Sequence, residues 1–439
     1  MAEEVWMLQT KKADFKQIGA RFRIDPVTAR IIRNRGIEGE AAIDRYLNGT
    51  LDDLYDPILL KDMERAVSIL CEAVDTGKKI RIVGDYDIDG VCSTYILLQA
   101  FERLGSDVDF EIPDRIKDGY GINESIIEQA HADGVEVILT CDNGISAFHQ
   151  VELAKKYGMT VVITDHHEVP LDGEKEKIPP ADAVIDPKQA DCPYPFPEIC
   201  GAVVAYKLVQ VLYARRGVPR MEWLDLLEFA AIATVGDVMK LQDENRILVK
   251  YGLKQLADTT NPGYRALLAV NGLEGKKLTA YHIGFVIGPC INASGRLDTA
   301  KRALELLGAS SKTEAEKLAG DLKALNDSRK DLTAKGTTEA IRLIEETDLG
   351  QDKVLVVYLP DCHESLAGII AGRIRERYFR PCFVLTDGEE GVKGSGRSIP
   401  GYHMFEEMTK VAELFTKFGG HPMAAGLSIP TENVELLRK

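Results

Sequence analysis

One short stretch constrains the fold of this chain more than any other. An apolar, β-prone run, Ile80–Val83, ends in three aspartates at alternate positions, Asp85, Asp87 and Asp89, and Gly90 follows them. If the apolar run is a buried strand, these carboxylates emerge at the carboxyl edge of a sheet, where α/β folds place their sites. Three carboxylates within about 10 Å of one another repel unless cations neutralise them, so the motif indicates a site for hard metal ions.

Two other interpretations of this motif are open at this point. Asp-x-Asp-x-Asp-Gly also begins an EF-hand loop, but Ile96 stands at the twelfth position, where that loop needs a bidentate Glu. The segment before the motif also has a strand pattern rather than a helical one, which argues against an EF-hand. A solvated acidic turn is the plain alternative, and partner residues elsewhere in the chain have to decide against it.

Length and charge narrow the class of protein. A chain of 439 residues exceeds one ordinary hydrophobic core, so two domains are expected. The net charge of −15 argues against a general nucleic-acid coat or a binder of anionic membranes, although a locally basic groove remains compatible with a nucleic-acid enzyme. The eight cysteines form no Cys-x-x-Cys pair, and no signal sequence or membrane-length apolar run is present. The sequence therefore predicts a cytoplasmic protein with no membrane association.

The order of the patterns predicts an α/β fold with a parallel sheet. Strand-like runs alternate with helical patterns of ten to fifteen residues from Lys79 to Ile185. From Ser310 to Glu346, apolar residues recur at helical spacing without proline, which predicts one long helix or a helix pair that breaks at Gly336. A second, smaller α/β pattern follows. The expected divisions are 1–50 for an N-terminal helical extension, 51–308 for a catalytic domain, 309–350 for a connector helix and 351–439 for the second domain.

Two further strand ends carry metal-binding residue types. Asp142 follows the apolar run Val137–Thr140, and Asp165, His166 and His167 follow the run Val161–Thr164. Because neighbouring parallel strands bring their carboxyl ends together, these residues are expected to share one cavity with the first motif. A mixed shell of carboxylate oxygen and imidazole nitrogen suits Mn²⁺ or Mg²⁺ better than metals that prefer sulfur ligands.

A fourth acidic candidate, Asp237, follows an otherwise apolar helical segment, Phe229–Val235. A buried carboxylate without a partner costs several kcal/mol, so it needs a metal or a counter-charge. A helix cap or a structural ion pair, for which Arg246 is a candidate, is the alternative to a metal-ligand role.

Taken together, the motifs resemble those of a known superfamily. Gly-Asp-Tyr-Asp-Ile-Asp-Gly, Cys-Asp-Asn-Gly, Thr-Asp-His-His, Val-Gly-Asp-Val and Asn-Ala-Ser-Gly-Arg-Leu occur in this order, and Lys-Gly-Ser-Gly-Arg-Ser and Gly-Gly-His-Pro-Met-Ala-Ala-Gly follow later. They are similar to the motifs of DHH phosphoesterases, and most of all to the RecJ single-stranded-DNA exonucleases. The resemblance implies a parallel-sheet DHH domain joined by a long connector helix to a smaller α/β DHHA1 domain.

The resemblance also implies a two-metal phosphodiesterase that uses Mn²⁺, with Mg²⁺ as a possible substitute. By motif position, two ions would be held by Asp87, Asp89, Asp142, His166 and Asp237, with Asp142 bridging. Catalysis would further involve Asp142 itself, with His167 over the scissile phosphate and Asp85 and Asp165 beside the ligands. The expected reaction is 5′→3′ hydrolysis of single-stranded DNA to mononucleotides in a cleft between the two domains.

Basic and glycine-rich stretches predict the substrate contacts. Glycines let backbone N–H groups approach phosphate, and Arg binds phosphate through two hydrogen bonds. The resemblance implies that Ser395 and Arg397, with Arg115, form a pocket for the 5′-terminal phosphate. It also places Gly419, Gly420 and His421 in the same cleft, although a Gly-Gly-His motif alone is more often a turn. The full set of predicted substrate-binding residues is Arg115, Asn292, Arg296, Arg373, Ser395, Arg397, Gly419, Gly420 and His421. Arg373 belongs to a group of arginines expected on one helix with Arg375, Arg377 and Arg380.

The chain departs from the superfamily pattern at two positions. Val83 stands where many relatives have a metal-binding histidine, and Cys290 stands where similar sequences often have arginine. The resemblance further implies a monomer that works with a helicase and a single-strand-binding protein, and a chain that stops short of an OB-type domain. The alternatives are a small-substrate DHH phosphoesterase and an inactive replication scaffold.

Overall fold

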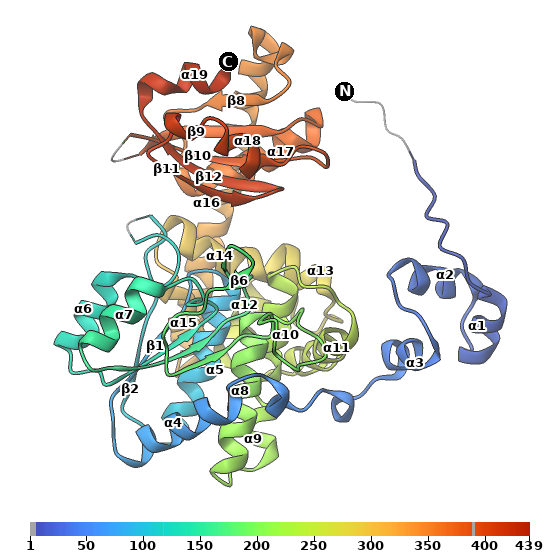
Figure 1. Ribbon diagram of the computed structural model, residues 1–439. Helices are drawn as coiled ribbons and strands as arrows, with labels where there is room; N and C mark the ends of the chain where they lie inside the picture. The colour runs from blue at the N-terminus through green and yellow to red at the C-terminus, as the bar shows by residue number, and fades with distance from the viewer. Residues whose placement is uncertain (1–5, 117, 389–390) are drawn as a thin grey trace. The chain divides into compact units, whose positions relative to one another are not determined.

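The computed structural model describes residues 6–116, 118–388 and 391–439. These residues form two compact units, Leu8–Lys323 and, chiefly, Ala324–Lys439 (Figure 1). The predicted α/β class, with a parallel sheet in the first unit and a smaller sheet in the second, is confirmed.

A five-stranded parallel sheet organises the first unit. Its strand order is β2-β1-β3-β4-β7, so β1 and β3 are neighbours although β2 lies between them in sequence. Such a reversal of strand order creates a topological switch point, which is where open α/β sheets bind ligands at their carboxyl ends. The strands are β1 (Ile80–Val83), β2 (Val108–Glu111), β3 (Val137–Cys141), β4 (Thr160–Thr164) and β7 (Ala183–Ile185), and a separate hairpin consists of β5 (Leu171–Asp172) and β6 (Lys175–Glu176).

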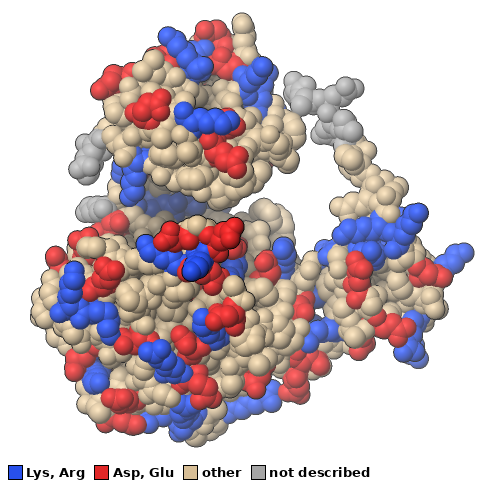
Figure 2. All heavy atoms as spheres, viewed as in Figure 1, with Lys and Arg blue, Asp and Glu red and all other residues tan. Residues whose placement is uncertain are grey.

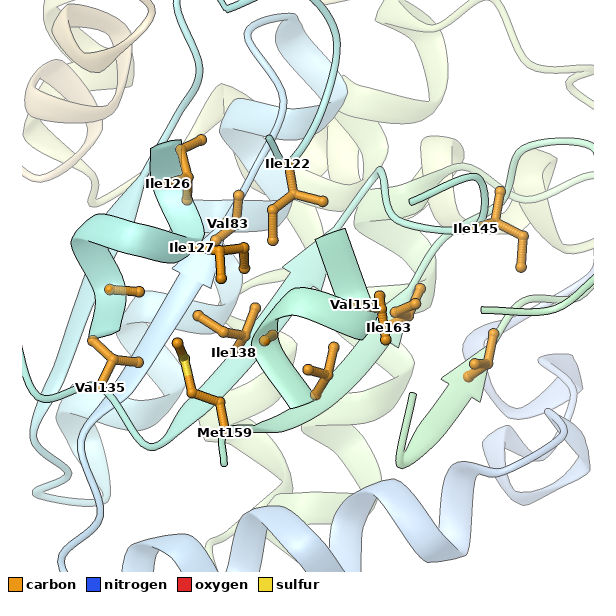
Figure 3. Close-up of a cluster of buried hydrophobic side chains, with 14 residues drawn as sticks. Val83, Ile122, Ile126, Ile127, Val135, Ile138, Ile145, Val151, Met159 and Ile163 are labelled. Atoms are coloured by element: carbon orange, nitrogen blue, oxygen red, sulfur yellow. The ribbon is translucent and has the colours of Figure 1, made fainter. Parts of the chain in front are cut away.

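One face of this sheet is covered by α6 (Glu124–Ala132) and α7 (Phe148–Lys156). Ile127 and Val151 from these helices pack on strand residues such as Ile138 in a buried apolar cluster (Figure 3). Val83 belongs to the same cluster and is fully buried. At this position the chain therefore contributes to the hydrophobic core and offers no metal ligand.

Most of the remaining helices of the first unit follow the largely buried α5 (Ile88–Arg103) in sequence. Helix α5 begins at Ile88, because Asp87 accepts hydrogen bonds from the backbone N–H groups of Asp89 and Gly90 and so caps it. The other helices are α4 (Met63–Asp75), α8 (Gly201–Arg215), α9 (Arg220–Leu224), α10 (Leu227–Gly236), α11 (Asp243–Ala257), α12 (Pro262–Val270), α13 (Ala280–His282), the π-helical segment Ile283–Ile287, α14 (Gly288–Leu297) and α15 (Lys301–Leu307).

Three short helices precede them and have a small core of their own. They are α1 (Phe15–Phe22), α2 (Pro26–Asn34) and α3 (Glu40–Asn48), followed by the 3₁₀ turns Leu51–Asp53 and Pro57–Leu59. Ile32, Ile37, Ile43 and Tyr46 are buried among them. The predicted helix start with proline in the first turn is confirmed at Pro26, and the Asp25 side chain caps it.

A single helix of 35 residues, α16 (Lys312–Glu346), runs from the first unit into the second. The predicted break at Gly336 is wrong, because the helix continues through this residue. A Cβ at Gly336 would lie 2.5 Å from Cδ1 of Ile370, so the glycine serves close helix packing and not a turn. The predicted long connector helix is confirmed.

The second unit is built on a mixed sheet with the order β11-β12-β10-β9-β8, in which only the β8–β9 pair is parallel. Gly419, Gly420 and His421, whose motif alone favours a turn, lie in strand β11. The elements are β8 (Leu355–Tyr358), α17 (Glu364–Tyr378), β9 (Cys382–Gly388), β10 (Gly391–Arg397), α18 (Met404–Thr409), β11 (Lys417–His421), β12 (Ala424–Ile429) and α19 (Val434–Arg438), with 3₁₀ turns at Asp348–Gln351, Ala412–Leu414 and Thr431–Asn433. No helix within the described ranges is long and apolar enough to span a membrane.

Candidate active site

Acidic residues and histidines converge where β1, β3 and β4 end, at the switch point of the parallel sheet. Three groups have potential ligand atoms within 4.8 Å of one another. They are Asp85, Asp87 and Asp142; Asp89, His166 and Asp237; and Asp142, His166 and His167. Asp142 and His166 each belong to two groups, so the three groups form one continuous cluster.

Helix N-termini hold two of the carboxylates in place. Both oxygens of Asp89 accept hydrogen bonds from the start of α8, from Gly201 N–H at 2.7 Å and from Ala202 N–H at 2.8 Å. The Asp87 carboxylate caps α5, as described above. Because helix N-termini stabilise negative charge, α5 and α8 stabilise these two carboxylates, neither of which forms an ion pair with Lys or Arg within the described ranges.

Asp142 lies at the centre of the cluster in a strained backbone conformation. Its φ of +61° is in the left-handed region, which costs a non-glycine residue of order 1–3 kcal/mol and occurs mainly at functional sites. Helix α8 approaches it so closely that a Cβ on Gly201 would lie 2.7 Å from Cβ of Asp142. Burial, followed by repulsion from Asp89, Asp87 and Asp85, raises the pKa of Asp142 well above its ordinary value.

The imidazole of His166 faces three carboxylates through one nitrogen. Its Nε2 lies 3.1 Å from Asp142, 3.4 Å from Asp89 and 3.8 Å from Asp237. Burial lowers the pKa of His166, which favours the neutral ring that a metal ligand requires. Its Nδ1 is buried and has no hydrogen-bond partner among the described residues.

His167 has the opposite electrostatic character. Its Nδ1 lies 2.7 Å from Oδ1 of Asp165, whose Oδ2 accepts from the Ile145 N–H at 2.9 Å. Although burial opposes protonation, the hydrogen bond to Asp165 and the surrounding carboxylates raise the pKa of His167 to about 9. At neutral pH this side chain is therefore a cation, and Asp165 orients His167 and not the more buried His166.

Asp85 and Asp237 complete the cluster. Burial and the neighbouring Asp87 raise the pKa of Asp85 to about 8, and its Oδ1 is buried without a partner within the described ranges. Burial and the charge of Asp89 raise the pKa of Asp237 to about 8. Asp237 lies one residue past α10, and Arg246 does not support it: Nε of Arg246 donates to the Tyr46 carbonyl, and its guanidinium lies over the Tyr46 ring.

The predicted substrate residues of the first unit surround the same loop. Arg115 lies over the Tyr86 ring at 4.6 Å, and both Arg115 and Arg296 act on Tyr86 electrostatically. Oδ1 of Asn292 accepts from the Ile88 N–H at 2.8 Å, so this side chain positions the start of α5. The structure thus brings all three residues to the acidic loop.

In the second unit, Ser395, Arg397, Gly419 and His421 share one sheet face, whereas the alternation along β11 directs Gly420 to the opposite face. Ser395 is aligned across the sheet with Gly426 and then Gly419, and Arg397 is aligned with Ala424 and then His421. Residues opposite one another on adjacent strands project to the same face. Helix α17 packs on this face, because a Cβ on Gly368 would lie 2.7 Å from Nη2 of Arg397.

The arginines of α17 do not form the predicted island of free charge. Arg375 pairs with Glu376 and Arg377 pairs with Glu345. Arg380 lies beyond the helix, where its Nη1 donates to the carbonyls of Gly350 and Asp352. Arg373 is exposed on α17. Neighbouring carboxylates and helix termination, which sequence spacing does not reveal, account for the difference.

Comparison with known proteins identifies the family. Family models match residues 79–234 (DHH family, N-terminal domain) and 351–439 (DHHA1 domain). The single-stranded-DNA-specific exonuclease RecJ of Bacillus subtilis (strain 168) is 37% identical over 436 residues, 99% of this chain and 54% of that protein. RecJ of Escherichia coli (strain K12) is 37% identical over 435 residues, 95% of this chain and 74% of that protein. The chain belongs to the RecJ family.

A solved RecJ structure agrees with this assignment. RecJ of Thermus thermophilus in complex with Mn²⁺ has a TM-score of 0.81 and 30% identity, covering 96% of this chain and 59% of that one. A second structure of the same protein is in complex with Mg²⁺. The chain spans about half the length of the B. subtilis relative and about three quarters of the E. coli RecJ.

Sequence reasoning missed Asp186 and the hydrogen-bonding role of Tyr120 beside the RecJ-type cluster. Asp186 follows β7, is fully buried, and has a pKa raised to about 7 by burial and by Asp165. It could have been found, because it follows a predicted strand in the same way as Asp142. The Tyr120 hydroxyl donates to the Asp142 carbonyl at 2.8 Å and lies 3.1 Å from the His167 ring nitrogens. Tyr120 follows no strand, so no local signal indicated that its hydroxyl contacts Asp142 and His167.

Proposed function

We propose that this chain is a metal-dependent 5′→3′ exonuclease that hydrolyses single-stranded DNA to 5′-mononucleotides. The observation that carries the proposal is the convergence of Asp85, Asp87, Asp89, Asp142, His166 and Asp237 at one sheet edge, without Lys or Arg ion-pair partners among the described residues. The names of the RecJ relatives support single-stranded DNA as the substrate. Neither alternative, a small-substrate phosphoesterase or an inactive scaffold, is favoured by a specific observation.

The donor set fits two divalent cations, Mn²⁺ or Mg²⁺. Carboxylate oxygens with one imidazole are suitable ligands for both metals, and RecJ of Thermus thermophilus has been solved in complex with each of them. The unpartnered Oδ1 of Asp85 and the raised pKa values of four carboxyl groups indicate a cluster that lacks its counter-charge. We propose Asp87, Asp89, Asp142, His166 and Asp237 as the ligands, with Asp142 shared between the two ions. When bound, such cations lower the pKa of a water and neutralise charge on the phosphoryl oxygens.

The other side chains of the site orient the substrate and hold protons. We propose that His167, kept protonated by Asp165, donates a charge-assisted hydrogen bond to a non-bridging oxygen of the scissile phosphate. The Tyr120 hydroxyl holds the Asp142 backbone in place through its hydrogen bond to the Asp142 carbonyl. The same hydroxyl limits rotation of the His167 ring. Asp85 adds a carboxylate to the side of the site that Asp87 and Asp142 form.

A phosphate grip is proposed for the remaining residues. Arg115, Asn292 and Arg296 contact the acidic loop or its aromatic residue, which supports contacts to the DNA backbone near the scissile bond. The shared sheet face of Ser395, Arg397, Gly419 and His421, with exposed Arg373 on the helix that packs there, supports a pocket for the 5′-terminal phosphate. We propose that Gly420, next to Gly419 on β11, contributes its backbone to this pocket. The glycines leave backbone N–H groups accessible, and Arg397 supplies a cation.

Further features of the proposal rest on family membership. We propose four segments, 1–50, 51–308, 309–350 and 351–439, as an N-terminal extension, a DHH catalytic domain, a connector and a DHHA1 substrate domain. A cytoplasmic location, a monomeric state, and cooperation with a helicase and a single-strand-binding protein in recombination and repair fit such an exonuclease.

One assay tests the proposed activity. Single-stranded DNA labelled at either end, duplex DNA and short RNA are incubated with the protein in Mn²⁺, Mg²⁺ or EDTA. Release of mononucleotides only from 5′ ends of single-stranded DNA, and only with metal, is expected. Cleavage confined to dinucleotides would favour a small-substrate phosphoesterase, and the absence of any metal-dependent cleavage would favour a scaffold.

A further inference from the structure

The first two N-terminal helices, α1 and α2, are basic in an acidic protein. Residues 11–35 contain eight Lys or Arg and two Asp, a net of six positive charges, whereas the whole chain carries −15. Both aspartates are helix caps: Asp14 accepts from Gln17 N–H, and Asp25 accepts from Val27 and Thr28 N–H. Their charges therefore stabilise the starts of α1 and α2, and they form no ion pair with the basic side chains within the described ranges.

Most of these cations also lack acidic partners elsewhere. Among the described residues, carboxylates reach only Arg21, through Glu40 at 3.4 Å, and Arg33, through Glu38 at 2.7 Å. Lys12, Lys16, Arg23 and Arg30 are exposed, and Figure 2 shows Lys and Arg gathered along the upper edge of this helical region. Val27 and Ile31, one turn apart on α2, are 66% and 50% exposed beside these charges. The surface is thus basic, with apolar side chains within it.

The helices are attached next to the candidate active site. Nε2 of Gln242 donates to the Arg35 carbonyl at 2.7 Å, and Arg45 pairs with Asp243 at 3.0 Å. Gln242 lies five residues after Asp237, a separation that spans at most about 18 Å of extended chain. The helices that carry the basic surface are therefore bonded to the segment that follows one of the cluster's carboxylates.

We propose that α1 and α2 form a docking surface for the phosphate backbone of single-stranded DNA on the 3′ side of the scissile bond. The proposal rests on the proposed exonuclease function. Charge complementarity identifies the occupant: a row of exposed cations that lack carboxylate partners binds polyphosphate and releases counterions. Val27 and Ile31 provide apolar area for sugars and bases. The surface holds the uncut part of the strand while its 5′ end is at the metal cluster.

The test compares two variants that each lose four positive charges. One is Lys12→Ala, Lys16→Ala, Arg23→Ala and Arg30→Ala combined; the matched control is Lys156→Ala, Lys254→Ala, Lys276→Ala and Lys277→Ala combined, at exposed sites of the same unit. Binding of a 3′-fluorescein 30-nucleotide oligo(dT) is measured by anisotropy in EDTA at several salt concentrations. Hydrolysis of a 5′-phosphorylated trinucleotide is measured with Mn²⁺.

The N-terminal variant is expected to bind the 30-mer at least about 10-fold more weakly than the control. The slope of log K against log salt should become shallower by about 0.7 for each phosphate that the variant no longer neutralises. Trinucleotide hydrolysis should match that of the wild type. Equal affinity and salt dependence in the two variants would overturn the docking surface while leaving the exonuclease proposal intact.

Other results separate the remaining explanations. A wild-type protein that hydrolyses neither substrate would contradict the proposed function itself. If the N-terminal variant keeps full DNA affinity but loses binding of a poly-Glu peptide that the wild type binds, the surface recognises an acidic protein, and the DNA proposal is wrong. Thermal unfolding of both variants establishes that the exposed substitutions leave the fold intact.

Discussion

Replacement of Gly201 by alanine tests whether the geometry around Asp142 controls catalysis. The new Cβ would lie 2.7 Å from Cβ and 2.9 Å from Cα of Asp142, whereas carbon atoms pack at about 3.5–4.0 Å. One side must therefore move by about 1 Å. The Asp142 N–H is bonded to the Thr164 carbonyl at 3.0 Å, and the start of α8 is bonded to Asp89. Either movement displaces a proposed metal ligand.

The expected effect is large on turnover and small on stability. A misplacement of about 1 Å in a catalytic constellation costs about 100-fold in rate. Overpacking costs about 1–3 kcal/mol, which the higher helix propensity of alanine offsets by up to about 1 kcal/mol. Gly201→Ala should therefore remain folded, lose about two orders of magnitude in kcat on 5′-labelled single-stranded DNA, and bind Mn²⁺ more weakly in calorimetric titration.

Gly320→Ala is the matched control. Gly320 is also helical, on α16, and a Cβ there would meet no atom within 4 Å. This substitution should raise the free energy of unfolding by about 0.5–1 kcal/mol and leave kcat unchanged. Wild-type turnover and Mn²⁺ affinity in Gly201→Ala would refute the argument that the close approach of α8 positions Asp142.

Three further predictions concern charge. Burial raises the pKa of Glu228 to about 7 from 4.5, so the folded state binds the proton more tightly and this group's contribution to stability is lost as pH rises from about 4.5 to about 7. Glu228→Gln should therefore stabilise the protein by about 2–3 kcal/mol more at pH 8 than at pH 5, measured by urea unfolding, and the exposed-site change Glu152→Gln should show no such difference. Asp142→Asn should abolish turnover and raise the metal-free Tm, because it removes a repelling charge; saturating Mn²⁺ should raise Tm by about 5–10 °C in the wild type and by much less in the variant. Asp165→Asn should lower the pKa of His167 from about 9 toward its ordinary value, so the alkaline limit of kcat should move to lower pH; an unchanged profile would argue against a cationic His167.

The sequence alone was sufficient to predict the candidate metal cluster where residues of metal-binding type directly follow a strand pattern. Strands β1, β3 and β4 are short, largely apolar runs, and the ligand-type residues follow these runs closely, as Asp142 follows β3. Parallel pairing then requires that these ends meet at one edge. The sequence did not determine which histidine ring Asp165 orients. The Asp165 carboxylate bonds the ring of His167, whereas from His166 it accepts only the backbone N–H, and no periodicity in the sequence describes this difference.

Failures of prediction occurred where tertiary contacts override local signals. Gly336 favours a helix break by propensity, yet close packing against Ile370 retains it within α16. The Gly-Gly-His motif favours a turn, yet Gly420 allows β11 and β12 to approach closely, since a Cβ there would lie 2.4 Å from the Ala424 carbonyl oxygen. In both cases glycine is needed because another part of the chain packs directly against it. A single sequence does not reveal such a contact.

Val83 makes the proposed site chemically asymmetric. With Val83 buried in the core cluster beneath α6, the group of Asp85, Asp87 and Asp142 contains only oxygen donors, whereas the group of Asp89, His166 and Asp237 includes an imidazole. Oxygen-only sites suit Mg²⁺ and Mn²⁺ alike, and an imidazole ligand favours Mn²⁺. Asp85 has the buried, unpartnered oxygen on the side where the superfamily pattern has a histidine. We therefore expect the Asp85 carboxylate to provide negative charge on the side of the site that lacks the imidazole, because a bound cation favours the ionised form of a neighbouring carboxyl group.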